Sequence, residues 1–259
     1  MHDVWLVGAG PGDPDQLTRK AERLIREASV VFYDALVGPG VLALIPPHVR
    51  RVSVGKRSGR HSKDQRSIND LLVEAALGGE RVVRLKGGDP AIFGRAAEEI
   101  AALAAHGITA RICPGITAAS AAAANAGISL SLRGSARRVQ FVTAHARAGE
   151  ALDLDWQALA DPAATLAIYM GRAVARQVAD QLMAHGLPGE TPVIVAAGIS
   201  LPNEQLVHSR LDLLGLVAHS ILPDVPVLLL IGCATRPVAA KPDRDEGANA
   251  APRLCSSAG

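Results

Sequence analysis

Short apolar runs alternate with amphipathic segments along the first part of the chain. The apolar runs end at glycine or polar residues, which predicts buried strands at 4–8, 30–33, 51–54, 81–85 and 110–112. Between them, apolar residues recur with helical spacing, which predicts helices over 17–28, 65–77 and 95–105. Strands that alternate with helices in this way form a parallel sheet covered by helices on both faces.

The second part of the chain continues the alternation and adds one closely spaced pair of strands. The same patterns predict strands at 139–143, 165–169, 192–196, 205–207 and 227–231. Helices are predicted over 117–126, 173–185 and 211–219. Because the 192–208 pair is so close in sequence, we expect an antiparallel hairpin there and a mixed second sheet.

These patterns predict an α/β protein of two α/β domains, the first with a parallel sheet and the second with a mixed sheet. We place the boundary near 113–116, which gives domains at 1–113 and 114–236. From Pro237 onward the chain is rich in Ala, Pro, Asp, Arg, Gly and Ser and lacks periodicity. We therefore predict a disordered tail at 237–259.

Composition excludes several classes of protein. The 27 basic and 25 acidic residues give a net charge of +2, which does not point to nucleic acid or to a membrane surface. No apolar run reaches the roughly 18 residues that span a bilayer, and no signal peptide is recognisable. The three cysteines are odd in number and widely spaced, which favours a reduced, cytoplasmic protein without a zinc site. HExxH, CxxC and GxSxG motifs are absent, so no metal is expected.

A glycine-rich turn, GAGPGD, follows the first predicted strand at 8–13. It is similar to a dinucleotide-binding fingerprint, but Asp13 stands where the third glycine should be. An acidic residue at a helix start repels phosphate. The alternative is a tight turn from strand to helix, with Asp13 or Asp15 near the helix N-terminus.

A second glycine-rich turn, LKGGDP, follows the strand at 81–85. Gly87 and Gly88 allow a ligand to approach the backbone closely, and Asp89 can accept hydrogen bonds from a hydroxyl or an ammonium group. The alternative is a structural loop in which Pro90 begins a helix. Because ligands bind at the carboxyl ends of strands in open α/β sheets, two such turns indicate a site for a ligand without phosphate.

Basic residues are concentrated at 50–66, where the only acidic residue is Asp64. The cations are Arg50, Arg51, Lys56, Arg57, Arg60, Lys63 and Arg66. One interpretation is a solvated surface loop; the other is a clamp for a small molecule with several carboxylates, which arginine binds bidentately. Arg133, Arg137 and Arg138, at the start of the second domain's first strand, are candidates for the same ligand.

Seven spaced motifs resemble those of the class III tetrapyrrole methylases and occur in the same order. They cover about residues 3–235 and read GAGPGDP, VFYDALV, VGKRSGRH, VVRLKGGDPAIFGR, PGITAA, IYMG and SLPNEQ. The resemblance implies a two-domain homodimer that binds S-adenosylmethionine in the cleft between the domains. It also implies two successive C-methylations of uroporphyrinogen III to precorrin-2, which feeds sirohaem or cobalamin synthesis.

The resemblance also implies roles for individual residues. Asp34 matches the proposed proton acceptor, Lys56 the proposed proton donor, and Arg133 an arginine that faces the tetrapyrrole; Arg57 and Arg60 of the basic segment join it as substrate-binding candidates. The residues that match donor contacts are Pro11, Gly87, Gly88, Asp89, Ile92, Thr117, Ala118, Met170 and Ile199.

The sequence departs from the family pattern at three places, and other functions stay open. Leu132 and Gly134 replace a histidine and an acidic residue, Ala197-Gly198 replaces an acidic-Asn pair, and GRAAEE at 94–99 replaces GRGGEE. These departures bear on substrate preference. The alternatives are a methylase of a later precorrin or of a modified histidine in a protein, a nicotinamide oxidoreductase, and a non-catalytic tetrapyrrole-binding protein.

Overall fold

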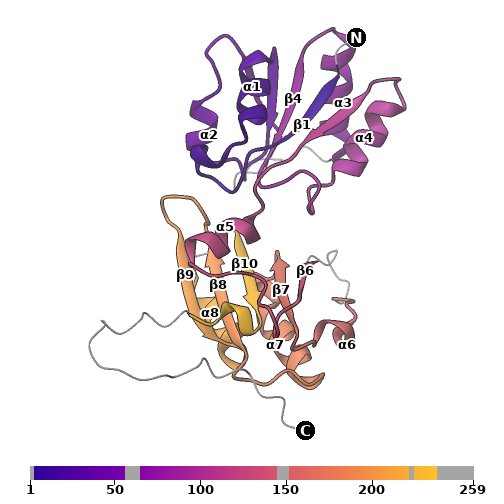
Figure 1. The fold of residues 1–259 in the computed structure, drawn as a ribbon. Coiled ribbons are helices and arrows are strands. Elements are labelled where there is room, and N and C mark those ends of the chain that lie inside the picture. Colours follow the sequence, from indigo (N-terminus) through magenta and orange to yellow (C-terminus); the bar gives the residue numbers. More distant parts are fainter. Residues whose placement is uncertain (1–2, 56–64, 145–151, 222–224, 238–259) are drawn as a thin grey trace, which may run out of the picture. The chain divides into compact units, whose positions relative to one another are not determined.

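The computed structural model describes residues 3–55, 65–144, 152–221 and 225–237 and divides into two compact units (Figure 1). The first unit consists of the chain up to Ala121 together with Ile199–Pro202, and the second consists of Ala122–Gly198 and the chain from Asn203 on. The division falls inside helix α5 (Ala118–Asn125) rather than at 113–114 as expected from the sequence. The predicted tail lies outside the described residues, apart from Pro237.

The first unit contains a five-stranded sheet in the order β3-β2-β4-β1-β5, and all of its pairings are parallel. Its strands are β1 (Val4–Gly8), β2 (Val30–Tyr33), β3 (Arg50–Ser53), β4 (Val82–Lys86) and β5 (Ala110–Cys113). The predicted parallel sheet is therefore confirmed. Strand bounds agree with the sequence analysis to within one residue at either end.

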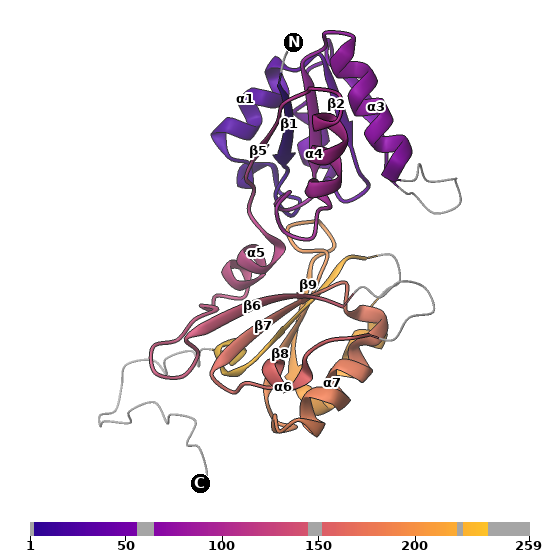
Figure 2. The same cartoon turned by 90° about the vertical axis from the view of Figure 1, so that its right-hand side faces the viewer.

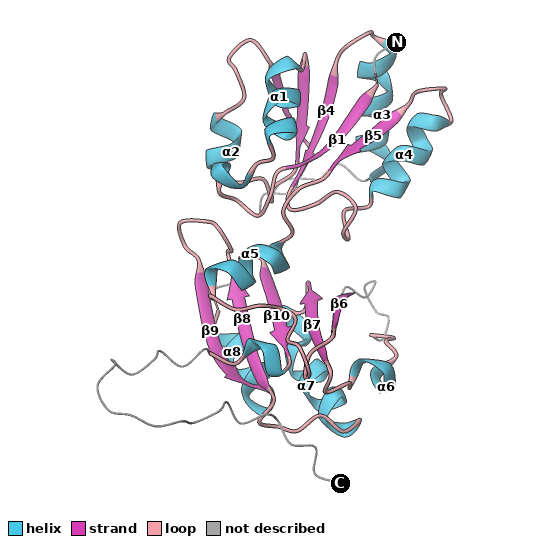
Figure 3. Cartoon of the chain, viewed as in Figure 1, coloured by secondary structure: helices cyan, strands magenta, loops and turns pink. Residues whose placement is uncertain are grey.

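Helices cover both faces of this sheet (Figure 3). They are α1 (Arg19–Glu27), α2 (Pro39–Ala43), α3 (Gln65–Leu77) and α4 (Ala96–Ala104). One core cluster joins Ile25 of α1 and Val41 of α2 to the sheet, and the other joins Leu72 of α3 and Leu103 of α4 to its opposite face. Alternate strand residues supply the two clusters, because successive side chains in a strand point to opposite faces.

The second unit contains a mixed sheet in the order β6-β7-β10-β8-β9. Its strands are β6 (Arg138–Thr143), β7 (Ala164–Tyr169), β8 (Pro192–Ala197), β9 (Gln205–Arg210) and β10 (Val227–Ile231). β6 and β7 are parallel, whereas the remaining pairs are antiparallel. The predicted hairpin is β8–β9, so the mixed sheet is confirmed.

Helices pack against this second sheet, where Figure 2 labels α6 and α7 and Figure 1 also labels α8. They are α6 (Trp156–Leu159), α7 (Ala175–Ala184) and α8 (Leu214–Ser220). Val178 and Leu182 of α7 share a buried cluster with Leu214 of α8 and with alternate residues of β7, β8 and β10. None of the described helices combines the length and the apolar composition that crossing a bilayer requires.

Candidate functional site

Three loops meet at the carboxyl edge of the first sheet. They follow β1, β4 and β5, which are adjacent strands in the order β4-β1-β5. The first two loops exchange backbone hydrogen bonds: the Gly88 amide donates to the Gly10 carbonyl at 2.7 Å, and the Gly10 amide donates to the Gly88 carbonyl at 3.2 Å. Both glycine turns were predicted at this edge, and they are in direct contact.

Glycine is required here because the backbones touch. A Cβ atom on Gly115 would lie 2.2 Å from the Gly88 carbonyl oxygen, and one on Gly8 would lie 2.6 Å from the Gly115 Cα. Gly88 differs, because its φ is 68° and a Cβ there would meet no atom within 4 Å. Gly88 therefore has the left-handed conformation that favours glycine and has open space beside it.

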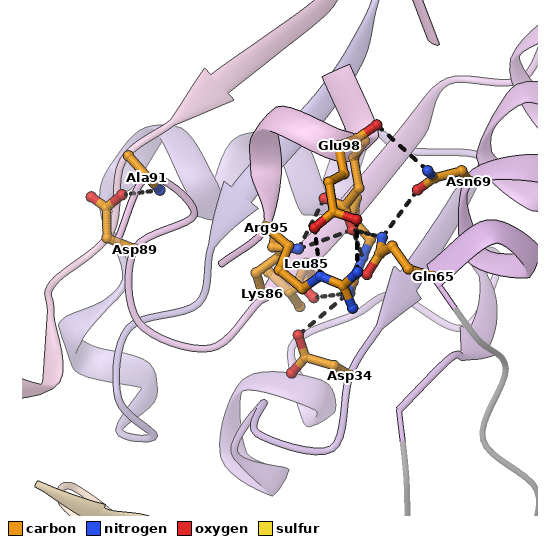
Figure 4. A network of polar contacts seen from close by, with 11 residues as sticks. Asp34, Gln65, Asn69, Leu85, Lys86, Asp89, Ala91, Arg95 and Glu98 are labelled. Carbon is orange, nitrogen blue, oxygen red and sulfur yellow. Dashed lines mark hydrogen bonds and ion pairs between the residues drawn. The ribbon is translucent and has the colours of Figure 1, made fainter. Parts of the chain in front are cut away.

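Asp89 ties two of these loops together. Its Oδ1 accepts a hydrogen bond from the Ala91 amide at 2.7 Å, and its Oδ2 accepts one from the Gly115 amide at 3.1 Å. Figure 4 shows the first of these bonds. Pro90 does not begin a helix: turns follow it, and α4 starts at Ala96. A carboxylate has further lone pairs, so a ligand contact by Asp89 stays a prediction.

The alternative interpretation of Asp13 as a helix cap is confirmed. Its Oδ1 accepts a hydrogen bond from the Asp15 amide at 2.9 Å at the start of a short 3-10 helix, Pro14–Gln16. Thr18 then caps α1 by accepting a hydrogen bond from the Ala21 amide at 3.1 Å, so this helix begins later than Leu17. Neither residue leaves an open helix terminus for a phosphate group.

The other predicted donor contacts of the first unit lie in its loops, except Ala118, which begins helix α5. Pro11 is half-buried in the first glycine turn, and the Ile92 amide donates to the Asp89 carbonyl at 3.1 Å. Thr117 accepts a hydrogen bond from the Ser120 amide at 3.2 Å at the start of α5, whose first residue is Ala118. Ile199, in the segment assigned to this unit, is buried.

Two predicted site residues belong to the second unit. Met170 follows β7 with a φ of 57°, and the residue is 49% exposed. A left-handed conformation is uncommon for a residue with a side chain and is often found at functional positions. Arg133 is exposed in the loop before β6. Arg138, another candidate for the anionic ligand, is already paired with Asp161.

Asp34 lies just after β2, on a neighbour of β4. Its Oδ1 accepts a hydrogen bond from the Leu36 amide at 3.0 Å, and its Oδ2 lies 3.3 Å from Nη2 of Arg84. The side chain remains 23% exposed. Asp34 thus caps this turn, which is one of the two roles left open from the sequence; its side chain is partly exposed, and its role as a base stays a prediction.

A buried cluster of charged side chains contacts Asp34 and was not predicted from the sequence (Figure 4). Glu99 of α4 accepts hydrogen bonds from Arg84 Nε at 3.1 Å and from Lys86 Nζ at 2.9 Å. Burial and the neighbouring Arg84 charge lower the pKa of Lys86, although Glu99 opposes the shift. The sequence signal was the spacing of Arg84 and Lys86, which puts two cations on one face of a buried strand.

The basic segment is only partly described. Lys56, Arg57, Arg60 and Lys63 lie outside the described residues. Arg50 pairs with Glu80 at 2.6 Å, and Arg51 donates to the Ile45 carbonyl at 2.6 Å. These two arginines of β3 are thus bonded within their own unit, and the prediction that they join a clamp receives no support.

Comparisons with known proteins agree with this geometry. The tetrapyrrole (corrin/porphyrin) methylase family matches residues 3–214, so the chain belongs to that family. A uroporphyrinogen-III C-methyltransferase of Paracoccus denitrificans is 49% identical over 233 residues, which cover 90% of this chain and 81% of that protein. A siroheme synthase of Yersinia enterocolitica is 50% identical over 89% of this chain, which spans about half (48%) of that relative's length.

The fold is also similar to that of a solved structure. The structure of a uroporphyrin-III C-methyltransferase of Thermus thermophilus, complexed with S-adenosylhomocysteine, matches with a TM-score of 0.76 and 37% identity. The match covers 90% of this chain and 93% of that one. The predicted resemblance and the two-sheet α/β class are confirmed. Among the described residues, no three His, Cys, Asp or Glu side chains gather as metal ligands do.

Proposed function

We propose that this chain transfers two methyl groups in succession from S-adenosylmethionine to carbon atoms of uroporphyrinogen III, giving precorrin-2 for sirohaem or cobalamin synthesis. The observation that carries the proposal is the loop edge at β1, β4 and β5, where the half-buried Gly88 has open space beside its Cα. The Gly88 amide and carbonyl are both bonded to Gly10, so what this edge offers a ligand is the space beside the Gly88 Cα. The names of the two relatives at about half identity favour this substrate over a later precorrin.

S-adenosylmethionine supplies an electrophilic methyl group on sulfur. In this proposal Pro11, Gly87, Gly88, Asp89 and Ile92 bind it, together with the further contacts Thr117, Ala118, Met170 and Ile199. The chain contributes mainly alignment of the attacking carbon with the methyl group, which is worth several kcal/mol of a barrier. Asp34, partly exposed at the same edge of the sheet, accepts the proton that the macrocycle loses.

The substrate's carboxylates are assigned to arginines. Arg133 is exposed and has no described ion pair, so it is free to bind a carboxylate bidentately. Arg57 and Arg60 join it in the proposal, and Lys56 is the proposed proton donor. We further infer a homodimer in the cytoplasm; the free thiols of Cys113 and Cys233 are consistent with a reducing compartment.

Incubation with uroporphyrinogen III and radiolabelled S-adenosylmethionine tests the proposal. We expect label in the tetrapyrrole fraction and an equal amount of S-adenosylhomocysteine. Calorimetric titration should show binding of S-adenosylhomocysteine and none of NAD, which separates a methylase from an oxidoreductase. Donor binding without any label transfer to uroporphyrinogen III would reject this substrate and leave the methylase class standing.

A further inference from the structure

Strand β4 places two cations on one buried face. Val83 and Leu85 enter the core cluster beneath α1 and α2, whereas Arg84 and Lys86 alternate with them and meet α4 on the opposite face. Their side chains are only 4% and 5% exposed. Such positions are normally apolar in a parallel sheet, so these two charges need a buried partner.

Glu99 is that partner, and its side chain is completely buried. It lies in the first turn of α4, where the helix dipole favours a carboxylate. Both of its oxygens accept hydrogen bonds from Lys86 Nζ at 2.9 Å, and Oε1 also accepts one from Arg84 Nε at 3.1 Å. Because it has no exposed surface, Glu99 cannot touch a substrate.

Arg84 connects this sealed carboxylate to Asp34. Its Nε faces Glu99, its Nη1 donates to the Leu85 carbonyl at 2.9 Å, and its Nη2 lies 3.3 Å from Asp34 Oδ2. The guanidinium is planar, so bonds at Nε and Nη1 fix the direction of Nη2. The Leu36 amide holds the other oxygen of Asp34, and the carboxylate is therefore fixed from the protein side at both atoms.

Stability alone does not account for such a cluster. Replacing a buried ion network by apolar side chains of similar volume is often neutral or stabilising, because desolvation offsets much of the attraction. Two cations face two carboxylates here, and one of those carboxylates, on Asp34, is 23% exposed at the loop edge. The cluster thus extends from the buried Glu99 to the partly solvent-exposed Asp34.

We propose that Glu99 is a positioning residue for methyl transfer: it holds Arg84, and Arg84 holds Asp34 in the orientation that accepts the proton. The inference rests on the proposed role of Asp34. In that step a carbon–carbon bond to the methyl group forms, the sulfur–carbon bond breaks, and its electron pair stays on sulfur. The proton released by the macrocycle passes to Asp34, while Glu99 and Arg84 keep their protonation states.

A double-mutant cycle on the single-turnover rate tests the inference. We expect Asp34→Asn to slow methylation about a hundredfold and Glu99→Gln to slow it about tenfold through misorientation. Glu99→Gln should leave S-adenosylhomocysteine affinity unchanged. The double variant should be no slower than Asp34→Asn, because Glu99 acts only through Asp34. Glu80→Gln, which removes the half-buried partner of Arg50 in the same unit, is the control and should keep the wild-type rate.

Additive losses in the double variant, or a wild-type rate for Glu99→Gln, would overturn the inference. A wild-type rate for Asp34→Asn would reject Asp34 as the proton acceptor and Glu99 as the residue that positions it. The proposed methyl transfer itself would not be affected by that result. If Glu99→Gln does not fold, Arg84→Met replaces it in the cycle, since Glu99 then keeps Lys86 as a one-to-one partner. The same non-additivity with Asp34→Asn is expected.

Discussion

Oδ2 of Asp89 lies 3.1 Å from the amide nitrogen of Gly115, and this bond joins the loop after β4 to the loop after β5. Oδ1 of the same carboxylate closes the turn to Ala91. Hydrogen bonds to a carboxylate are stronger than those between neutral groups. Asp89 therefore fixes the shape of the proposed donor edge, whatever it contributes to the donor directly.

Asp89→Ala should loosen this edge. The variant removes two bonds to backbone amides and is expected to lose roughly 1–3 kcal/mol of unfolding free energy, with weaker S-adenosylhomocysteine binding. Calorimetry and thermal unfolding measure the two effects. Asp155→Ala, which removes a comparable cap from α6, should lower the melting temperature alone. Equal donor affinities for wild type and Asp89→Ala would contradict the role given to this residue.

Gly88 and Gly79 form a matched pair for testing the donor turn. Both have positive φ values, 68° and 80°, and a Cβ on either would meet nothing within 4 Å. Replacement by alanine should therefore lower the unfolding free energy of each variant by about 1 kcal/mol, because a residue with a Cβ is strained in the left-handed conformation. Only Gly88→Ala should also weaken S-adenosylhomocysteine binding, since its added methyl group occupies the proposed donor space. Equal donor affinities in the two variants would remove Gly88 from the donor site.

Arg133→Ala should affect the tetrapyrrole and spare the donor. Loss of a charge-assisted contact to a substrate carboxylate is expected to lower kcat/KM for the tetrapyrrole about ten- to a hundredfold. Steady-state kinetics and a donor titration measure the contrast, with Arg176→Ala, at an exposed arginine of α7 in the same unit, as the control. Damage to donor binding alone would show that Arg133 had been assigned to the wrong ligand.

Lys86 should make the unfolding free energy depend on pH in the alkaline range. Burial lowers the pKa of Lys86 in the folded chain below the ordinary value of 10.5. Between the lowered pKa and pH 10.5, Lys86 is therefore protonated more often in the unfolded chain than in the folded chain. The unfolding free energy then rises with pH across that range and falls as pH drops through the lowered pKa. Urea unfolding measures the unfolding free energies of wild type and Lys86→Met. The value for wild type minus the value for Lys86→Met should increase as the pH rises toward 10.5. A constant difference would contradict the shift.

Much of the fold could be predicted because periodicity is a local signal. The runs at Val4–Gly8 and Val227–Ile231 and the helix at Gln65–Leu77 have the predicted bounds. Two short helices, α2 and α6, were missed because neither is long enough to show a repeat. The segment Ile199–Pro202 was assigned by position in sequence, whereas its contacts place it with the first unit.

The candidate site was predictable where it depends on glycine turns and a family pattern. The contact between Gly10 and Gly88 follows from two turns at one sheet edge, and sequence reasoning found both turns. The Glu99 cluster was not found, because pairing across a strand and a helix depends on tertiary packing. Asp89 was interpreted as a ligand acceptor, since no local pattern reveals that Gly115 donates to it.

Transfer of a methyl group to carbon is the central claim, and carbon-13 NMR of the product tests it most directly. The protein is incubated with uroporphyrinogen III and S-adenosylmethionine labelled in its methyl group. The account predicts two labelled methyl signals, each at the chemical shift of a methyl group bonded to carbon. Labelled methyl groups on oxygen or nitrogen, or an unlabelled tetrapyrrole beside protein that binds the donor, would contradict it.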